Sequence, residues 1–229
     1  MGHYEKAWQA ARVRIDEATR AAGRSSNTVK LLAVSKTFGP EALRAVYTMG
    51  QRSFGENYVQ EAVLKRNALA DLPDIEWHLI GPLQSNKARV AAETFDWVET
   101  IDRLKVAERL AAARPGAMPP LRVLVQVNAS GEATKSGVPP AEAVALARAV
   151  HRLPGLTLRG IMGIPEPTQD RTEQRRQFRV LRECFDACRA ADLPVDTLSM
   201  GMSADLEAAI AEGATEVRVG TAIFGRRDA

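Results

Sequence analysis

Short apolar runs alternate with amphipathic stretches along most of the chain. The runs are rich in valine, isoleucine, leucine or aromatic residues and are bounded by glycine, proline or polar residues, which is typical of β-strands. They lie at residues 31–35, 52–56, 76–80, 97–101, 122–128, 157–162, 196–200 and 216–220. The clearest run, LRVLVQVN, is almost continuously apolar, as expected of a parallel strand that is covered on both faces.

Helical patterns separate these runs. The stretch 40–50 begins with proline and ends in glycine, an asymmetry typical of helices, and the stretch 139–155 repeats it. Residues 203–213 predict a helix with Ser203 as its N-cap, and residues 171–191 place apolar side chains at helical spacing. One more amphipathic helix precedes the first strand. Strands that alternate with helices predict a parallel sheet.

The number of strand–helix units predicts the architecture. Eight such units in 229 residues favour an α/β fold of the (β/α)8 or TIM barrel type, with an extra N-terminal helix, as a single domain over residues 1–229. The alternative is an open doubly wound sheet. It is disfavoured because no G-x-G-x-x-G motif follows the first strand.

Composition and charge exclude several classes of protein. The chain is 45% hydrophobic and 26% charged, with a net charge of +3, which is ordinary for a globular protein and too weakly basic to indicate nucleic-acid binding. We find neither a secretory signal nor an apolar run of the ~20 residues that a membrane helix needs. We therefore expect a cytoplasmic protein without nucleic-acid or membrane partners. Cys184 and Cys188, with three scattered histidines, suggest packing thiols and no metal site.

Small and polar residues gather where the predicted strands end, which is where barrels carry their active sites. The first strand, in the segment LLAVSKT, runs into Lys36, a side chain that is costly to bury. The loops after strands seven and eight often bind phosphate in barrels, together with a short extra helix. The candidates here are Ser199, Gly201, Gly220, Thr221 and a predicted helical turn in TAIFG. The alternative interpretation is two ordinary loops with turn glycines.

Barrel closure brings these two ends of the chain together. Strand eight pairs with strand one in a closed barrel, so Lys36 is expected beside the phosphate site. A partly desolvated lysine can attack an aldehyde, and a lysine beside a phosphate cradle predicts a Schiff-base site for a phosphorylated aldehyde. Pyridoxal 5′-phosphate (PLP) is the obvious candidate. The alternative is a lysine that reaches solvent at a strand end.

Arg218 adds to this hypothesis. Its neighbours Val217 and Val219 point one way in a strand, so Arg218 points the other way. If it faces the barrel, it can hydrogen-bond the pyridine nitrogen of PLP and leave that nitrogen unprotonated, which weakens carbanion chemistry. The alternative is an arginine that packs among the outer helices.

Seven segments in order carry a resemblance to a known family. They are LLAVSKT, FGENYVQE, WHLIGPLQSNK, VNASGEATKSG, RGIMGIP, LSMGMSADLEAAI and EVRVGTAIFG. With them, the chain resembles the pyridoxal phosphate homeostasis proteins, a cytosolic family of PLP-binding (β/α)8 barrels. The family is in turn similar to the barrel of bacterial alanine racemases. The resemblance therefore implies a fold of the PLP type III kind without the C-terminal β-domain of those enzymes.

The resemblance also implies a set of site residues. Lys36 would carry PLP as an internal aldimine, and Arg218 would face the pyridine nitrogen. Ser199, Gly220 and Thr221 would hold the phosphate, with help from the backbone around Gly201. Asn57 and His78 would line the ring side, with Met162 and Met200 as apolar neighbours. His78 has an alternative as a core histidine with its hydrogen bonds satisfied, and no residue is assigned as catalytic.

The implied role is vitamin B6 homeostasis without robust catalysis. The protein would be a monomer that holds PLP, with PLP-dependent apo-enzymes as candidate recipients. A PLP-dependent amino-acid racemase is the main alternative, but it needs an acid/base group on each face of the substrate. Of Tyr4, Tyr47 and Tyr58, only Tyr58 is near a strand end. A phosphate-binding barrel lyase that uses Lys36 is the third interpretation.

Overall fold

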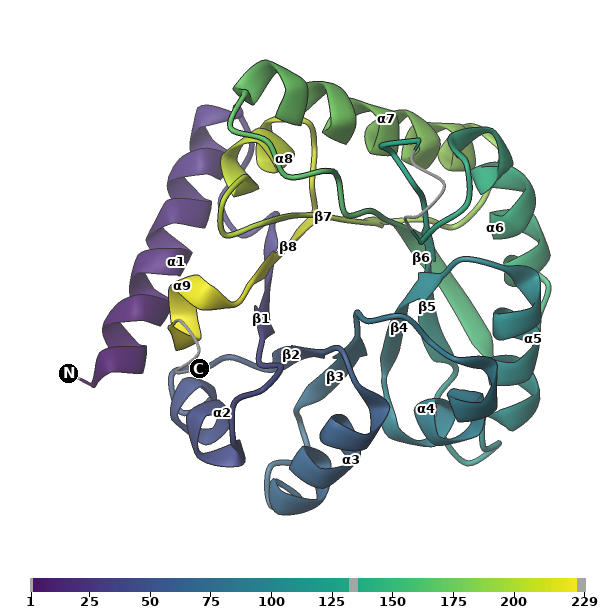
Figure 1. Ribbon diagram of the computed structural model, residues 1–229, viewed down its shortest axis with the longest axis horizontal. Helices are drawn as coiled ribbons and strands as arrows, with labels where there is room; N and C mark the ends of the chain where they lie inside the picture. The colour runs from purple at the N-terminus through teal and green to yellow at the C-terminus, as the bar shows by residue number, and fades with distance from the viewer. Residues whose placement is uncertain (1, 132–135, 226–229) are drawn as a thin grey trace.

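A closed barrel of eight parallel strands forms the centre of the molecule. The computed structural model describes residues 2–131 and 136–225. The strands follow one another around the barrel in chain order, and β1 pairs with β8 to close it (Figure 1). They are β1 (Lys30–Val34), β2 (Ser53–Glu56), β3 (Glu76–Leu79), β4 (Trp97–Ile101), β5 (Leu121–Gln126), β6 (Leu156–Met162), β7 (Thr197–Met202) and β8 (Glu216–Val219). The predicted barrel is confirmed, and the open sheet is wrong.

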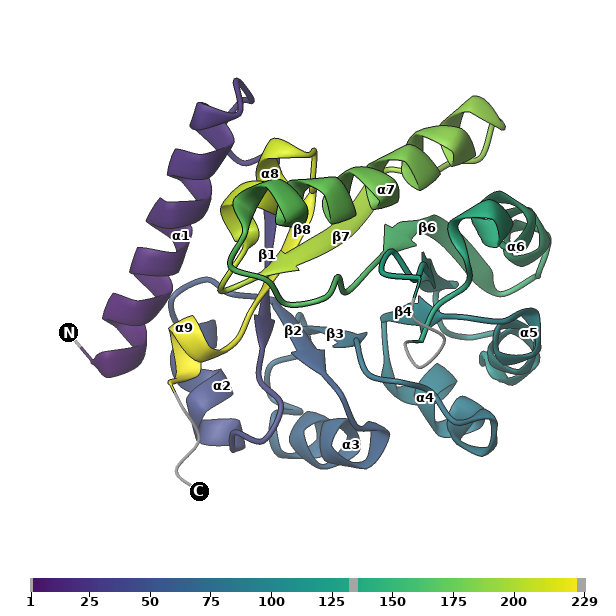
Figure 2. The same cartoon turned by 45° about the horizontal axis from the view of Figure 1, so that its top comes forward.

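Helices form a ring around the strands (Figure 1). They are α1 (His3–Ala21), α2 (Pro40–Tyr47), α3 (Val59–Ala68), α4 (Ala88–Thr94), α5 (Leu104–Ala113), α6 (Ala143–His151), α7 (Arg171–Ala190), α8 (Leu206–Ala211) and α9 (Thr221–Phe224), with 3₁₀ turns at η1 (Ser85–Lys87) and η2 (Pro140–Glu142). The N-terminal helix α1 lies against α2, α8 and α9, as Figure 2 shows. The extra helical turn predicted after the last strand is α9.

Two predicted boundaries around β7 are wrong. The strand continues to Met202 because the pairing of β7 with β8 shifts register between Ser199 and Met202. Gly201 lies in this shift at φ +93°, and a Cβ there would lie 2.5 Å from the Cβ of Ala209. Helix α8 begins at Leu206 and not near Ser203, because the Met202 N–H donates to Oδ1 of Asp205 at 2.6 Å and fixes a turn ahead of the helix.

Apolar side chains divide between the outside and the inside of the barrel. One large cluster fills the layer between strands and helices. Two small clusters lie inside the barrel, as period-two alternation of the strands requires. They are Leu32 with Val34 and Ile80, and Trp97 with Leu124 and Met162.

The two cysteines belong to the outer layer. Cys184 and Cys188 are buried free thiols on α7. Burial raises the pKa of each to about 11, so both stay protonated and act as packing groups. Within the described residues, no helix has the length and apolar character needed to cross a membrane. A single domain over residues 1–229 stays a prediction.

Candidate functional site

Lys36 lies in a tight turn just beyond the end of β1. The N–H of Phe38 donates to the carbonyl of Ser35 at 3.1 Å, so Lys36 and Thr37 are the two central residues of the turn. Ser35 is buried, Lys36 is half-buried and Thr37 is exposed. Thr37 has φ +72°, in the left-handed region. The backbone thus turns sharply at the lysine that the sequence singles out.

The end of β8 packs directly against this turn. Ala33 of β1 pairs with Val219 of β8, and a Cβ on Gly220 would lie 3.2 Å from the carbonyl oxygen of Val34. After the turn, the ring of Phe38 stacks on Phe224 of α9 with centroids 5.2 Å apart. The Lys36 turn is therefore bracketed by two contacts with the β8–α9 segment, and the predicted closeness of the two chain regions is confirmed.

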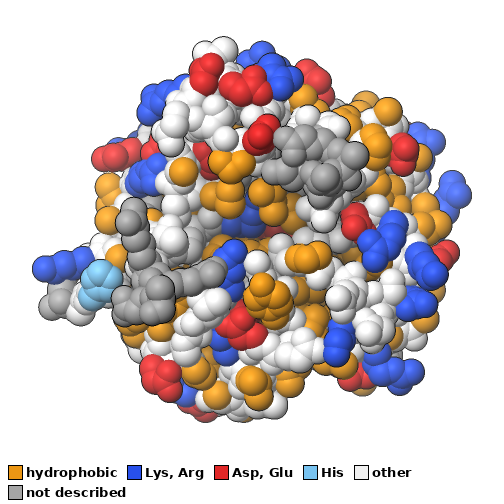
Figure 3. Space-filling view, in the orientation of Figure 1, with side chains coloured by type: hydrophobic (Ala, Val, Ile, Leu, Met, Phe, Trp, Pro, Cys, Tyr) orange, Lys and Arg blue, Asp and Glu red, His pale blue; other side chains and the backbone are white. Residues whose placement is uncertain are grey.

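The start of α9 offers backbone donors beside Lys36. Gly220 is the N-cap of α9, and its carbonyl accepts from the N–H groups of Ile223 and Phe224. The N–H groups of Thr221 and Ala222, which precede these donors, have no partner within the helix. An anion is stabilised at such a position, and the missing side chain of Gly220 allows close approach. Figure 3 shows the α9 end of the barrel hollowed near its centre, with hydrophobic and basic side chains around the hollow.

Arg218 lies inside the barrel, as its alternation with the flanking valines predicts. Its guanidinium donates from Nη1 to Oγ of Ser199 and from Nη2 to the carbonyl of Gly163, each at 2.7 Å. Burial lowers the pKa of Arg218, while the nearby carboxylate of Glu99 opposes that shift. The alternative position among the outer helices is wrong.

Ser199 differs from the expectation of a phosphate ligand. Its hydroxyl is fully buried, donates to Oε2 of Glu99 at 2.7 Å and accepts from Arg218. Both of its hydrogen-bonding functions are thus used inside the barrel. In this arrangement Ser199 supports Arg218, and its role at the phosphate stays a prediction.

The side chain of His78 also makes its contacts inside the barrel. Its Nδ1 lies 2.6 Å from Oε1 of Glu99, and its Nε2 lies 3.4 Å from Nζ of Lys30. The ring stacks on Trp97 with centroids 5.0 Å apart and an interplanar angle of 8°. Burial lowers the pKa of His78 to about 4, so the ring is neutral. These contacts favour the alternative of a core histidine.

Two buried glutamates lie beside His78, and the sequence analysis did not identify them as candidate functional residues. Glu99 and Glu216 are fully buried, and neither side-chain oxygen of Glu216 has a hydrogen-bond partner. Burial raises the pKa of Glu216 to about 7, with a further contribution from Glu99. Burial also raises the pKa of Glu99. Both glutamates lie on strands that also carry a buried polar residue, Thr100 in β4 and Arg218 in β8. Residue type alone therefore did not show that they face the inside of the barrel.

His78, Glu99 and Glu216 form what we call the inner cluster. Their ligand-type atoms lie within 4.8 Å of one another, a spacing that suits a metal ion. However, Nζ of Lys30 lies 3.9 Å from Oε2 of Glu216 and close to His78. The cluster therefore has a cation of its own, and we assign no metal to it.

The remaining predicted residues lie in different places. Asn57 lines a cavity of about 430 Å³ together with Tyr58, at the end of β2. Met162 packs inside the barrel, in the cluster with Trp97. Met200 instead packs in the outer layer between strands and helices. Strand alternation places Met200 opposite to the inward Ser199, and its role as an apolar neighbour of the ring stays a prediction.

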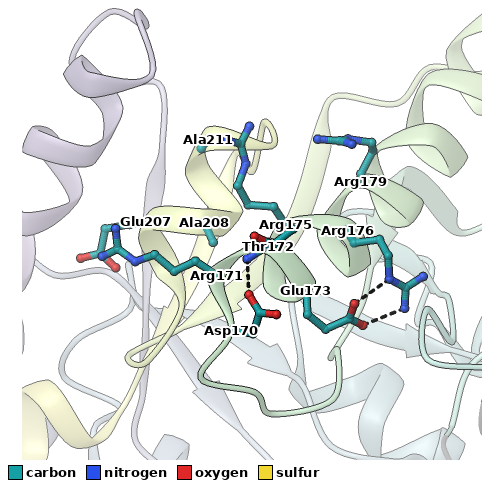
Figure 4. A pocket seen from close by; sticks show the side chains of 10 residues that line it. All are labelled: Asp170, Arg171, Thr172, Glu173, Arg175, Arg176, Arg179, Glu207, Ala208 and Ala211. Atoms are coloured by element: carbon teal, nitrogen blue, oxygen red, sulfur yellow. Dashed lines mark hydrogen bonds and ion pairs between the residues drawn. The ribbon is translucent and has the colours of Figure 1, made fainter.

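A larger cavity, of about 630 Å³, contains none of the predicted residues. It is a groove between α7 and α8 that is rich in arginine (Figure 4). Arg175 and Arg179 pair with Glu212, and Arg176 pairs with Glu173. Because these charges are compensated at the surface, the groove is a weaker candidate site than the barrel mouth.

Known proteins resemble the chain along almost its full length. Residues 9–228 match the family model described as alanine racemase, N-terminal domain. A pyridoxal phosphate homeostasis protein from Pseudomonas aeruginosa is 58% identical over 215 residues, which cover 94% of this chain and 92% of the relative. The chain belongs to the pyridoxal phosphate homeostasis protein family. A member from Escherichia coli K12 is 52% identical over 222 residues, 95% of this chain and 94% of the relative.

Solved structures agree with this family. PipY of Synechococcus elongatus, solved with PLP bound, is 39% identical with a TM-score of 0.81, and the match covers 92% of this chain and all of PipY. An alanine racemase from Corynebacterium glutamicum is 19% identical with a TM-score of 0.64, and the match covers 96% of this chain and 62% of the racemase. The second likeness shows a shared fold alone. The family segment VNASGEATKSG includes residues 132–135, which lie outside the described residues.

Proposed function

We propose that the protein holds PLP as a Schiff base on Lys36 and takes part in intracellular PLP homeostasis. The observation that carries this proposal is the packing of the Lys36 turn against Gly220 and α9. The family's name and the PLP-bound structure of PipY support the choice of PLP over other phosphorylated aldehydes. Bound PLP supplies a reactive aldehyde and an electron-withdrawing pyridine ring.

The phosphate of PLP fits the start of α9. Gly220 and Thr221 would bind it through backbone N–H groups and the Thr221 hydroxyl, where the helix end adds a partial positive charge. The backbone at Gly201 belongs to the same end of the barrel, because the shifted register pairs its neighbour Met202 with Arg218. Ser199 contributes through Arg218, which it holds by a hydrogen bond.

Arg218 and Asn57 fit the ring of PLP. An arginine with a fixed, buried guanidinium is a donor that stays charged, so it would leave the pyridine nitrogen unprotonated. An unprotonated ring withdraws electrons less strongly, which favours storage of PLP over carbanion chemistry. Asn57 lies at the open side of the barrel, and His78 contributes from below by holding Glu99.

The positions of the three tyrosines, considered as a second base, also support a non-catalytic role. Tyr47 donates to Oδ1 of Asp74 at the surface, and Tyr4 packs near Phe224. Tyr58 lies near the barrel mouth but is 60% exposed. Racemisation needs a positioned acid/base group on each face of the substrate. We therefore propose a carrier that acts as a monomer in the cytoplasm, with PLP-dependent apo-enzymes as recipients.

Absorbance of the PLP-loaded protein tests the Schiff base. We expect a band near the visible region that Lys36→Ala abolishes while the protein stays folded. The matched control is Lys87→Ala, because Lys87 is another half-buried lysine that lines the cavity beside Asn57, and this variant should keep the band. A band that survives in Lys36→Ala would contradict the assignment.

Isotope exchange tests the non-catalytic role. We expect no sustained entry of solvent deuterium at the Cα of L-alanine when the PLP-loaded protein is present. Sustained incorporation with turnover would instead support the racemase alternative. Transfer of PLP to an added apo-enzyme, faster than release into buffer, would support delivery.

A further inference from the structure

The residue after Lys36 has an unusual backbone conformation. Among the described residues other than glycine, Asn27, Thr37 and Asp192 have positive φ angles of 65°, 72° and 58°. Asparagine and aspartate tolerate this region, but a β-branched residue such as threonine is a true outlier there. Thr37 also occupies the third position of its turn, where a positive φ normally selects glycine. Such a conformation persists only where the surroundings hold it, and it often marks a functional site.

Two side chains of α3 hold the backbone on both sides of Lys36. Before it, Nζ of Lys65 donates to the carbonyl of Ser35 at 2.8 Å. After it, the N–H of Thr37 donates to Oε1 of Glu61. Lys65 and Glu61 are themselves paired at 2.7 Å. One ion pair therefore connects the residues that precede and follow Lys36.

Glu56 anchors this ion pair from the end of β2. Its Oε1 accepts from Lys65 at 2.7 Å and from the hydroxyl of Ser35 at 2.6 Å. The side chain of Lys65 is only 5% exposed, and that of Glu56 is fully buried. Buried ion pairs are weak evidence for stability, because desolvation offsets much of their attraction. The hydrogen bonds to backbone atoms at Ser35 and Thr37 point to a role in positioning.

We propose that Glu61 and Lys65 are positioning residues that hold the Lys36 turn in the geometry needed to bind PLP. We call them, together with Glu56, the turn clamp. The proposal rests on the proposed function of Lys36 and goes beyond it, because it assigns a role to a helix outside the barrel. Without the clamp, the Thr37 backbone would relax out of the left-handed region, and the turn that contains Lys36 would lose its fixed geometry.

Hydrogen exchange at the Thr37 amide tests the clamp without any cofactor. Thr37 is exposed, so its amide should exchange fast unless Glu61 holds it. In the PLP-free wild-type protein we expect slow exchange, measured by NMR. In Glu61→Ala we expect exchange about ten-fold faster, the size expected for loss of one hydrogen bond to a charged group. Fast exchange in the wild-type protein would overturn the proposal.

Affinity for PLP tests the consequence for binding. Glu61→Ala should raise the PLP dissociation constant about ten-fold, whereas Glu61→Gln keeps an acceptor and should stay within about three-fold of wild type. Adding Thr37→Gly to Glu61→Ala should recover most of the affinity, because glycine adopts a positive φ without strain. A merely structural role would lower the melting temperature of Glu61→Ala without this rescue.

A neighbouring arginine provides the matched control. Arg66 is on the same helix but donates to carbonyls at Glu93 and Thr94, away from Lys36. Arg66→Met should leave both the Thr37 exchange rate and PLP affinity unchanged. If Glu61→Ala accelerates exchange but binds PLP as the wild type does, the positioning role is wrong. If the wild-type protein carries no PLP on Lys36, the proposed function fails instead, while Thr37 exchange still reports on the clamp.

Discussion

The inner cluster and the turn clamp are both groups of buried or half-buried titratable side chains, but they are bonded differently. In the inner cluster, Glu99 bonds to the side chains of His78 and Ser199. In the turn clamp, Lys65 and Glu61 bond to backbone atoms of the segment that contains Lys36. We therefore expect the inner cluster to affect the stability of the barrel interior and its dependence on pH. We expect the turn clamp to determine the position of the turn that contains Lys36.

The two groups therefore differ in how directly they affect PLP binding. The inner cluster is connected to Arg218, the residue proposed to face the cofactor ring, through Ser199. The turn clamp reaches it through the two residues that flank Lys36. Substitutions in the clamp should therefore change both stability and affinity for PLP, whereas substitutions in the inner cluster should change stability and its dependence on pH.

The largest expected effect is that of Lys65→Met. It leaves Glu56 buried without its cation, and breaking a buried pair in this way costs about 3–5 kcal/mol of unfolding free energy. Urea unfolding measures the loss. Adding Glu56→Gln should recover part of it, because the uncompensated carboxylate is then gone. A loss below about 1 kcal/mol, the range of exposed ion pairs, would show that the clamp is not buried as described.

Arg218→Gln should have the next largest effect. Ser199 and the carbonyl of Gly163 lose their charged donor, and Glu99 loses a nearby positive charge. We expect a loss of about 2–3 kcal/mol in unfolding free energy, together with a shifted PLP absorbance band. An unchanged spectrum would mean that Arg218 does not face the pyridine ring. If Arg218→Gln has the wild-type spectrum but a lower unfolding free energy, Arg218 stabilises the barrel interior and does not affect PLP.

Glu216→Gln should have the smallest effect of the three on the unfolding free energy, and it should change how that free energy depends on pH. Burial raises the pKa of Glu216 from 4.5 to about 7 in the folded protein. The folded state therefore holds this proton more tightly than the unfolded state, and the resulting stability is lost as pH rises through about 7. The groups that face Glu216 are Glu99, His78 and Lys30. His78 acts in the opposite direction, because its lowered pKa removes stability as pH falls toward about 4.

Unfolding free energies at about pH 5 and about pH 8 measure this difference. The unfolding free energy of Glu216→Gln should gain about 2 kcal/mol relative to that of the wild type as pH rises between these values. The pKa of His78 is already lowered to about 4, and loss of the Glu216 charge lowers it further, so folded His78 is neutral in both proteins over this range and its contribution cancels. If the difference in unfolding free energy between Glu216→Gln and wild type is the same at both pH values, Glu216 titrates in its ordinary range.

The sequence predicted the barrel because strand and helix periods alternate clearly. It also predicted that Lys36 and Gly220 approach each other, because barrel closure follows from strand count alone. It missed Glu99 and Glu216 of the inner cluster, since a glutamate in a strand does not reveal which face it occupies until the register is known. The outward position of Met200 follows from alternation with the inward Ser199. The left-handed Thr37 depends on contacts with α3, a tertiary effect that local patterns do not encode.

Reduction of the PLP-loaded protein with borohydride, followed by peptide mapping, tests the central claim most directly. Reduction fixes a Schiff base as a stable amine, so the modified residue is identified by its mass. We predict that the label lies on Lys36. A label on any other lysine, or PLP that binds without becoming fixed, would contradict the account.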